Sequence, residues 1–290
     1  MDLTEQNLQN IHFIHLHNMT VDEMVEADRR VESRFHFFRG IWWREVKPFF
    51  YQPAWFLTPV KPKESRPNPF KSLGGYYHIV PEGSYSNSVI VTNSIENINE
   101  YSLEKLQHAK TRYNIKRGLK NVKILIPELE HVITDGYEVY LSWKQRIGKV
   151  YKDRSDENTF CNWINNEYLL SKRLILGAYT GDHLVAFLMG HAVEETACMT
   201  MIYSNSKFHS LHPVDALLYS FVLICQKSPG ITRIINGLKG LKPNLQIFKK
   251  RHGFKEIVYP AYINMNYLAR TVAKIILPEQ YKRLMGQYKD

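Results

Sequence analysis

The chain has 290 residues, of which 44% are hydrophobic and 23% are charged. This composition excludes a disordered or fibrous chain and suffices for one or two folded domains. No apolar run reaches the roughly 18 uncharged residues that a membrane-spanning helix needs, and the first residues do not resemble a secretion signal. The three cysteines have no metal-binding spacing, so we expect small buried side chains in a reduced, cytoplasmic protein.

The net charge of +10 is concentrated in two short segments. Residues 105–120 and residues 239–255 each contain six basic residues and no acidic residue. Without these twelve, the 38 basic residues fall to 26, against 28 acidic ones. Such concentration indicates an anionic partner, which could be nucleic acid, a phosphate-rich cofactor or an anionic lipid surface. The alternative is two solvated helix faces.

Residues 1–104 are predicted to form a small, separate α/β unit. A short strand is expected over 11–16, followed by a helix to about Arg34, which Thr20 and Glu23 open as a capping box. Strands are also expected over 76–80 and 88–92. Between the helix and these strands lie an aromatic cluster over 35–56 and six prolines between 48 and 69. The prolines are typical of extended connections rather than central strands.

The region 105–265 has a cleaner pattern of helices and strands. Helices are expected over 102–119, 130–147, 157–171, from Pro213 to the residues before Pro229, and over 243–252. Strands are expected over 122–126, 174–179, 184–192, 197–203, 231–235 and 257–263. This order predicts an α/β fold with a mixed, partly antiparallel sheet. A basic, amphipathic helical tail, 266–290, is expected to follow.

The order of elements is similar to that of the GNAT superfamily of acyl-CoA N-acyltransferases, and two motifs narrow this resemblance. The segment 110–116, Lys-Thr-Arg-Tyr-Asn-Ile-Lys, with Val-Lys-Ile at 122–124, resembles the element that opens the second GNAT domain of Fem-type aminoacyltransferases. The segment 245–254 resembles the Phe-Lys-containing signature near the C-terminus of that family. The resemblance covers about residues 100–265 and implies that 105–265 is a GNAT-like transferase domain, with a reduced GNAT-like lobe before it.

The resemblance implies transfer of an acyl group from an activated donor to a small-molecule or peptide amine. In Fem-type enzymes the Phe-Lys pair faces the transfer site, which assigns Lys249 to stabilising the charge that develops during transfer and places Phe248 beside it. The pattern alone leaves two alternatives open. One is that Lys249 is an exposed lysine among three consecutive basic residues. The other is that Phe248, by its helical spacing, is a core residue.

Acyl-CoA is the donor that the superfamily resemblance favours. The residues that would bind it lie at the junction before the central helix, and they are Tyr203, Ser204, Asn205, Lys207 and His212. However, the junction 204–213 has no glycine at the place where backbone N–H groups would cradle a pyrophosphate. Asp215 would repel a phosphate, and the helix 243–252 has no tyrosine to protonate a leaving thiolate.

Aminoacyl-tRNA is the alternative donor, in a Fem-like reaction on a cell-wall precursor. Four basic residues on the helix 102–119 are expected to project from one side and to contact phosphates, and they are Lys105, Arg112, Lys116 and Lys120. A third hypothesis is a non-catalytic module that keeps the fold and has lost the cofactor loop.

Two further expectations concern metals and membranes. His12, His15 and His17 have no acidic or cysteine partner nearby, so no metal site is predicted. The basic tail 266–290 is a candidate for peripheral contact with a membrane.

Overall fold

The computed structural model describes residues 2–30, 34–62, 67–148, 153–169, 172–240 and 242–287. The chain forms two compact units that alternate along the sequence. Unit 1 comprises Met1–Met19, Ser94–Gly237 and Ile247–Lys255, and unit 2 comprises Thr20–Asn93, Leu238–Gln246 and Glu256–Asp290. The division therefore differs from the consecutive ranges 1–104, 105–265 and 266–290, because both ends of the chain join the unit that their side chains help to bury.

Unit 1 is built on a mixed sheet with the strand order β11-β10-β9-β8-β7. The strands are β7 (Lys123–Leu125), β8 (Leu174–Thr180), β9 (His183–Val193), β10 (Thr196–Ser204) and β11 (Arg233–Leu238). β7 to β10 are antiparallel, β11 is parallel to β10, and the short β1 (Asn18–Met19) adds in parallel to the end of β9. The predicted three-strand meander and its two tight turns are confirmed.

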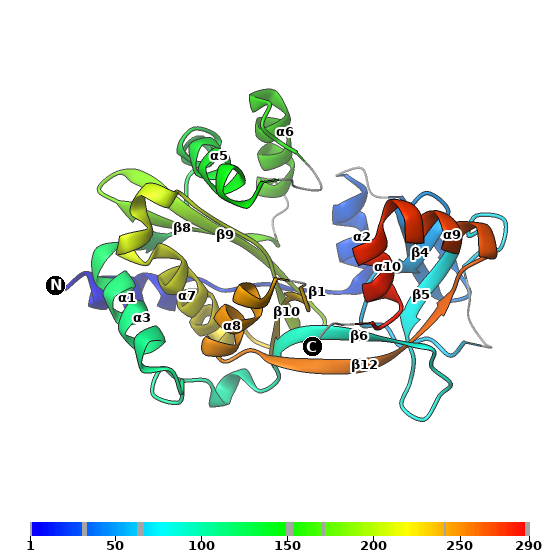
Figure 1. The fold of residues 1–290 in the computed structure, drawn as a ribbon. Helices are drawn as coiled ribbons and strands as arrows, with labels where there is room; N and C mark the ends of the chain where they lie inside the picture. The colour runs from blue at the N-terminus through cyan, green and yellow to red at the C-terminus, as the bar shows by residue number, and fades with distance from the viewer. Residues whose placement is uncertain are drawn as a thin grey trace. The chain divides into compact units, whose positions relative to one another are not determined.

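Helices cover both faces of this sheet, as Figure 1 shows. They are α1 (Leu3–His12), α3 (Ala109–Asn121), α4 (Leu129–Ile133), α5 (Asp135–Ile147), α6 (Glu157–Tyr168), α7 (Pro213–Lys227) and α8 (Pro243–Arg251), with 3-10 turns η1 (Ile98–Glu100) and η2 (Ser206–Leu211). Leu174 and Leu176 of β8 pack on the α1, α3 and α7 side, whereas Ile175 packs on the α4, α5 and α6 side. Because both faces are covered, the strands read as continuous apolar runs.

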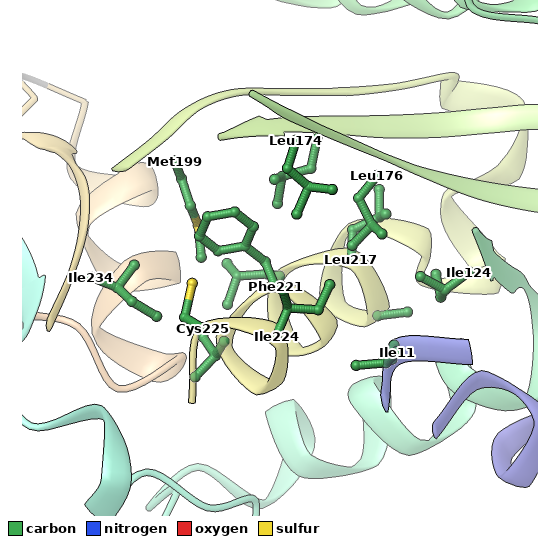
Figure 2. Close-up of a cluster of buried hydrophobic side chains, with 14 of the residues drawn as sticks. Ile11, Ile124, Leu174, Leu176, Met199, Leu217, Phe221, Ile224, Cys225 and Ile234 are labelled. Carbon is green, nitrogen blue, oxygen red and sulfur yellow. The ribbon is translucent and has the colours of Figure 1, made fainter. Parts of the chain in front are cut away.

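Helix α7 forms the centre of the larger core. Phe221 lies among Leu174, Met199 and Cys225 (Figure 2), and its ring packs so closely on Gly190 that a Cβ there would lie 2.4 Å from a ring carbon. Cys225 and Cys198 are buried, and burial raises the pKa of the Cys198 thiol to about 12. The expected role of these two cysteines as small apolar side chains is confirmed, while Cys161 is only half-buried.

Three expected elements of unit 1 are wrong in type or extent. Residues 3–12 form helix α1 where a strand over 11–16 was expected, so the three histidines do not share a strand face. The reason is tertiary: Asn7 is fully buried, donates to the carbonyls of Leu119 and Val122, and accepts from the N–H of Ile124. α3 begins only at Ala109, and the helix expected over 130–147 is broken at Thr134 (φ −83°, ψ −80°).

Unit 2 has the strand order β2-β3-β4-β5-β12-β6. Its strands are β2 (Phe35–Phe38), β3 (Ile41–Lys47), β4 (Phe50–Pro53), β5 (Gly75–Ile79), β6 (Ser88–Ile95) and β12 (Lys255–Asn264), and its helices are α2 (Val21–Arg29), α9 (Tyr267–Ile276) and α10 (Pro278–Leu284). The aromatic segment 35–56, over which no strand was predicted, therefore forms three paired strands. Pro53 is tolerated because it is the last residue of its strand.

The predicted capping box of α2 is confirmed. The Thr20 hydroxyl accepts from the N–H of Glu23 at 3.2 Å, and the Glu23 carboxylate accepts from the N–H of Thr20 at 2.8 Å. The helix ends at Arg29, earlier than expected, and the stretch 31–33 lies outside the described residues.

Candidate functional site

The parallel ladder between β10 and β11 is short. It joins Thr196–Cys198 to Arg233–Ile235, after which β10 has a bulge between Met199 and Met201. Both strands then continue, β10 to Ser204 and β11 to Leu238. Backbone groups beyond the end of a ladder need partners from side chains, water or a ligand. The end of this ladder is therefore a place where side chains can meet strand backbone.

Lys249 of α8 reaches β11 immediately beyond that ladder. Its Nζ donates to the backbone carbonyl of Asn236, and only 6% of the residue is exposed. Its neighbours Lys250 and Arg251 are exposed. Burial of an ammonium group is unfavourable unless the group is hydrogen-bonded or paired, so the fold holds this charge in place. The alternative that Lys249 is an exposed lysine is therefore wrong.

A buried histidine–carboxylate pair joins α8 to the first turn of α7. His252 is 1% exposed; its Nδ1 lies 2.9 Å from the Phe248 carbonyl and its Nε2 lies 3.0 Å from the Asp215 carboxylate. Because a carbonyl oxygen can only accept, Nδ1 carries a proton, and Nε2 faces the carboxylate. The Phe248 ring packs on His252 at 4.2 Å between centroids and is partly buried against the core. This pair thereby fixes the turn of α8 that carries Lys249.

The surroundings of Asp215 bear on its expected repulsion of a phosphate, which stays a prediction. Asp215 is buried, and besides His252 its carboxylate lies 3.6 Å from Nδ1 of His212. An acidic residue in the first turn also interacts favourably with the helix dipole. The Asp215 carboxylate therefore has histidine neighbours within the fold.

The backbone N–H groups of the β10–α7 junction already have partners within the chain. The N–H of Ser206 donates to the hydroxyl of Ser142, and that of Lys207 donates to the side chain of Asn205. The N–H of Phe208 donates to the carbonyl of Asn205. His212 has a left-handed backbone (φ 58°) and precedes Pro213 at the start of α7. These N–H groups do not form an open cradle for a pyrophosphate.

The sequence-predicted cofactor residues thus have different surroundings. Tyr203 belongs to the aromatic core around Tyr140 and Trp143, and burial raises the pKa of its phenol to about 12. Ser204 is buried, Asn205 and His212 are half-buried, and Lys207 is exposed. Ser204, Asn205, Lys207 and His212 therefore lie in the junction 204–213, whereas the ring of Tyr203 lies in the core.

Arg146 is a basic residue at the junction that the sequence did not reveal. Its guanidinium lies 3.2 Å from Nδ1 of His209 and 3.5 Å from the Ser204 hydroxyl. His209 Nε2 lies 3.1 Å from the same hydroxyl, and burial, aided by the charge of Arg146, lowers the pKa of His209. Arg146 is on α5, 58 residues before Ser204, so no local pattern connects them. A fixed guanidinium is suited to an anionic group of a ligand.

The predicted basic face of α3 is only partly present. Lys105 lies in the turn before the helix, because α3 starts at Ala109, so its expected helical spacing is wrong. Lys116 and Lys120 are exposed on α3, while Arg112 is half-buried and donates to the carbonyl of Leu106. α3 packs tightly on the start of α7, since a Cβ at Gly118 would lie 2.6 Å from the carbonyl oxygen of His212. The basic helix therefore lies next to the junction.

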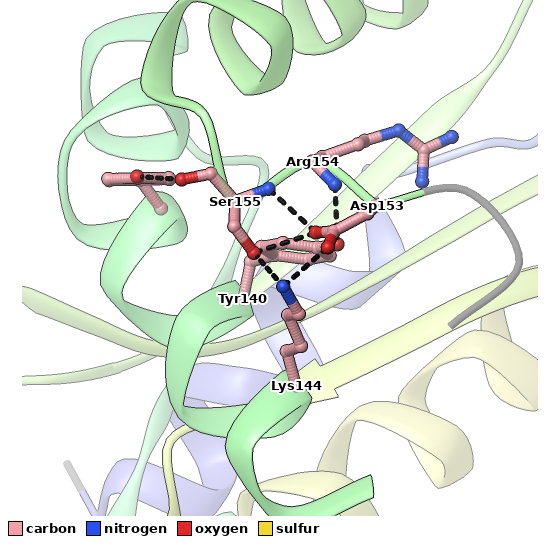
Figure 3. Close-up of polar contacts among 6 residues, drawn as sticks. Tyr140, Lys144, Asp153, Arg154 and Ser155 are labelled. Carbon is pink, nitrogen blue, oxygen red and sulfur yellow. Dashed lines mark hydrogen bonds and ion pairs between the residues drawn. The ribbon is translucent and has the colours of Figure 1, made fainter. Parts of the chain in front are cut away.

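A polar network joins residues 153–155, which precede α6, to α5. The Lys144 ammonium donates to Asp153 at 2.6 Å and to the Ser155 hydroxyl, as Figure 3 shows. The Tyr140 hydroxyl accepts from the N–H of Arg154 at 2.8 Å, and the Arg154 guanidinium lies 3.9 Å from the centre of the Trp163 ring. Residues 153–155 are thus tied to α5, the helix that carries Arg146.

The Lys144–Asp153 contact is expected to weaken between about pH 4 and pH 2. Hydrogen bonds from Lys144 and then Ser155 lower the pKa of Asp153 from 3.8 to about 2. A depressed carboxyl pKa means that the contact contributes stability above pH 3.8 and is lost as pH falls through about 2. NMR titration of the Asp153 carboxyl should give this low midpoint, and Lys144→Met should move it back toward 3.8. Lys120→Met, on a different helix, should leave it unchanged.

Metal ligation has no candidate in the described parts of the chain. No group of three or more histidine, cysteine, aspartate or glutamate side chains is arranged there to hold an ion. His12 lies at the end of α1, and its Nδ1 is 3.0 Å from the Lys227 ammonium.

Comparison with known proteins places this arrangement among solved structures. No family model and no curated protein matches the sequence. The C-terminal domain of a provisionally assigned lysylphosphatidylglycerol synthetase from Agrobacterium fabrum is similar in structure, with a TM-score of 0.57 and 12% identity over 99% of each chain. FemX has a TM-score of 0.55 and 8% identity, over 94% of this chain and 98% of FemX. L-PGS from Bacillus licheniformis has a TM-score of 0.54 and 12% identity, over 97% and 96%.

These similarities define the fold. The chain has a GNAT-like, Fem-type α/β fold, and the likeness extends over nearly the whole length of the chain, including the residues of both compact units. The predicted fold class and the resemblance are confirmed. The first hundred residues are therefore not an unrelated addition to the fold.

Proposed function

We propose that the chain is an N-acyltransferase, which moves an acyl group from an activated donor to the amine of a small molecule or peptide. The observation that carries the proposal is Lys249, a buried ammonium group held at the carbonyl of Asn236, where the β10–β11 ladder ends. The Fem-type fold supports it, since FemX and L-PGS share this architecture.

The proposed chemistry needs no covalent enzyme intermediate. The amine nitrogen attacks the acyl carbonyl, the C–N bond forms, and the carbonyl oxygen becomes an oxyanion. The Lys249 ammonium stabilises this oxyanion, which then collapses as the bond to the carrier breaks; the amine proton leaves to the carrier or to water. Because the ammonium is fixed before the reaction, its stabilisation costs no reorganisation in the transition state.

The proposal has two candidates for the acyl donor. Acyl-CoA is the donor that the superfamily resemblance favours, and Arg146 is placed to contact one of its phosphates. Its pyrophosphate would nevertheless meet junction N–H groups that Ser142 and Asn205 already engage. Aminoacyl-tRNA needs no such cradle and no acid for a thiolate, and the exposed Lys116 and Lys120 of α3 are suited to phosphate contacts. These observations favour aminoacyl-tRNA.

The third hypothesis, a non-catalytic module, is supported by the engaged junction and opposed by Lys249. A buried lysine that makes no contribution to function is replaceable by an apolar residue at little cost, or with a gain in stability. The proposed transfer gives the buried ammonium of Lys249 next to strand backbone a role that a non-catalytic module would not.

Binding experiments distinguish the donors. We expect filter binding of charged tRNA to weaken steeply between 50 and 200 mM salt, roughly 10³-fold or more if six or more phosphates are contacted. Lys116→Glu combined with Lys120→Glu should weaken it further, whereas Lys123→Glu serves as the control on β7. Calorimetry with acetyl-CoA should give no heat. Micromolar acetyl-CoA binding without tRNA binding would assign the donor to coenzyme A, and no binding of either would favour the non-catalytic module.

A further inference from the structure

Helix α9, Tyr267–Ile276, presents a continuous apolar face to solvent. Its large apolar side chains are between 45% and 86% exposed, and they are Tyr267, Leu268, Val272, Ile275 and Ile276. At 3.6 residues per turn these positions lie on one side of the helix. An exposed apolar stripe of this size on a short helix marks an interaction surface.

The opposite side of α9 attaches the helix to unit 2. Ala269 and Ala273 are half-buried, so small side chains face inward and the large ones face outward. Asn266 caps the helix by accepting from the N–H of Ala269 at 2.7 Å. The following helix α10 is anchored by the buried Tyr281 and by the Ser88 hydroxyl, which donates to the carbonyl of Leu284. The outward direction of the apolar face is thus a consequence of how the helix is packed.

A neighbouring loop extends this apolar face. The Asn266 side chain donates to the carbonyl of Leu73, which places the loop before β5 beside the start of α9. Leu73 is 61% exposed, and Phe70 in the same loop is 87% exposed. Two segments far apart in the sequence therefore contribute exposed apolar side chains to one region of unit 2.

Positive charge accompanies the apolar face. The basic residues of the two C-terminal helices are Arg270, Lys274, Lys282 and Arg283, against the single acidic residue Glu279. Over 266–287 the net charge is therefore +3. A helix with aromatic and aliphatic residues on one face and basic residues elsewhere has the composition of helices that lie in a membrane interface.

We propose that α9 docks unit 2 on the surface of an anionic lipid bilayer, with its axis parallel to the membrane and its apolar face in the headgroup region. In the described residues, no helix is long and apolar enough to cross a membrane. The ten residues of α9 span about 15 Å, roughly half of a bilayer's hydrocarbon thickness. Charge favours this occupant over a second copy of the chain, since two copies would bring like charges together, whereas anionic lipid attracts them.

Vesicle flotation tests the proposal without reference to enzymatic activity. The wild-type protein should float with vesicles containing phosphatidylglycerol and phosphatidylcholine, and bind much less to phosphatidylcholine alone. Leu268→Asp combined with Ile275→Asp should lower the partition coefficient at least about tenfold, because two apolar side chains no longer enter the interface. Arg270→Glu with Lys282→Glu should lower it on anionic vesicles by at least about fivefold for each charge.

A matched control is Phe13→Asp, which changes a side chain that is 80% exposed in unit 1 and should leave flotation unchanged. Unchanged melting temperatures establish that the variants remain folded. Absence of wild-type flotation with anionic vesicles, or equal flotation of the Leu268→Asp/Ile275→Asp variant, would overturn the proposal. So would sedimentation showing a dimer that this variant dissolves, because a second copy would then cover the face.

Discussion

Replacing Asp215 with alanine is expected to lower the free energy of unfolding by about 3 kcal/mol or more. The substitution removes the carboxylate that lies 3.0 Å from Nε2 of His252 and leaves that ring nitrogen buried without its partner. It also removes an acidic group from the first turn of α7. Urea denaturation of the wild type and the variant gives the difference directly.

Two controls test whether the loss of stability comes from the Asp215–His252 pair. Asp182→Ala changes an exposed carboxylate in the β8–β9 turn and should shift stability by no more than about 0.5 kcal/mol. A double-mutant cycle with His252→Ala should give a coupling energy well above that of an exposed pair, whose value is about 0–1 kcal/mol. Additive effects of the two substitutions would show that the pair does not connect α8 to α7.

Lys249→Ala is expected to lower turnover at least ~100-fold with donor and acceptor at saturation. Removal of one preorganised donor to an oxyanion typically costs that much, because the interaction is made most strongly in the transition state. The measurement is single-turnover transfer from the donor that the binding experiments identify. Lys250→Ala is the matched control, since Lys250 follows directly on α8 and is exposed; it should retain wild-type turnover.

Folding must be measured alongside this loss of turnover, because Lys249 is buried. Lys249→Met keeps most of the apolar length of the side chain and should fold at least as well as Lys249→Ala while remaining inactive. Wild-type turnover in either folded variant would remove Lys249 from the mechanism. A Lys249→Glu substitution is a poor probe of anion binding, since it would place an unpaired negative charge in the same buried position.

The sequence predicted the elements whose signals are local. The β8–β10 meander has branched apolar residues and tight turns, and α7 begins at Pro213 and ends before Pro229. α1 was missed because its helical state depends on Asn7, which bonds residues more than 110 positions away. The aromatic strands of unit 2 were missed because the prolines near them argue against strands. Residues such as Trp42 and Trp43 favour β-structure, but this preference depends on strand pairing, which the sequence does not show.

Only the part of the candidate site that lies in one sequence motif was predictable from the sequence. Phe248 and Lys249 stand in a recognisable segment, and their residue types suggest the chemistry. That segment does not show which residues hold Phe248 and Lys249 in place. Asp215 and His252 are 37 residues apart, and Arg146 lies on a helix that no sequence pattern connects to another site residue. Asp215 could only be read as a charge at a helix start, because its partners come from α8 and from the residue preceding α7.

The most direct test of acyl transfer assisted by Lys249 follows label from donor to amine. Purified wild type, Lys249→Ala and Lys250→Ala would be incubated with radiolabelled aminoacyl-tRNA or acetyl-CoA and a mixture of peptide and small-molecule amines. We expect the wild type and Lys250→Ala to form a labelled amide from one of the two donors, and Lys249→Ala to form at least ~100-fold less. Equal amide formation by wild type and folded Lys249→Ala would contradict this role of Lys249.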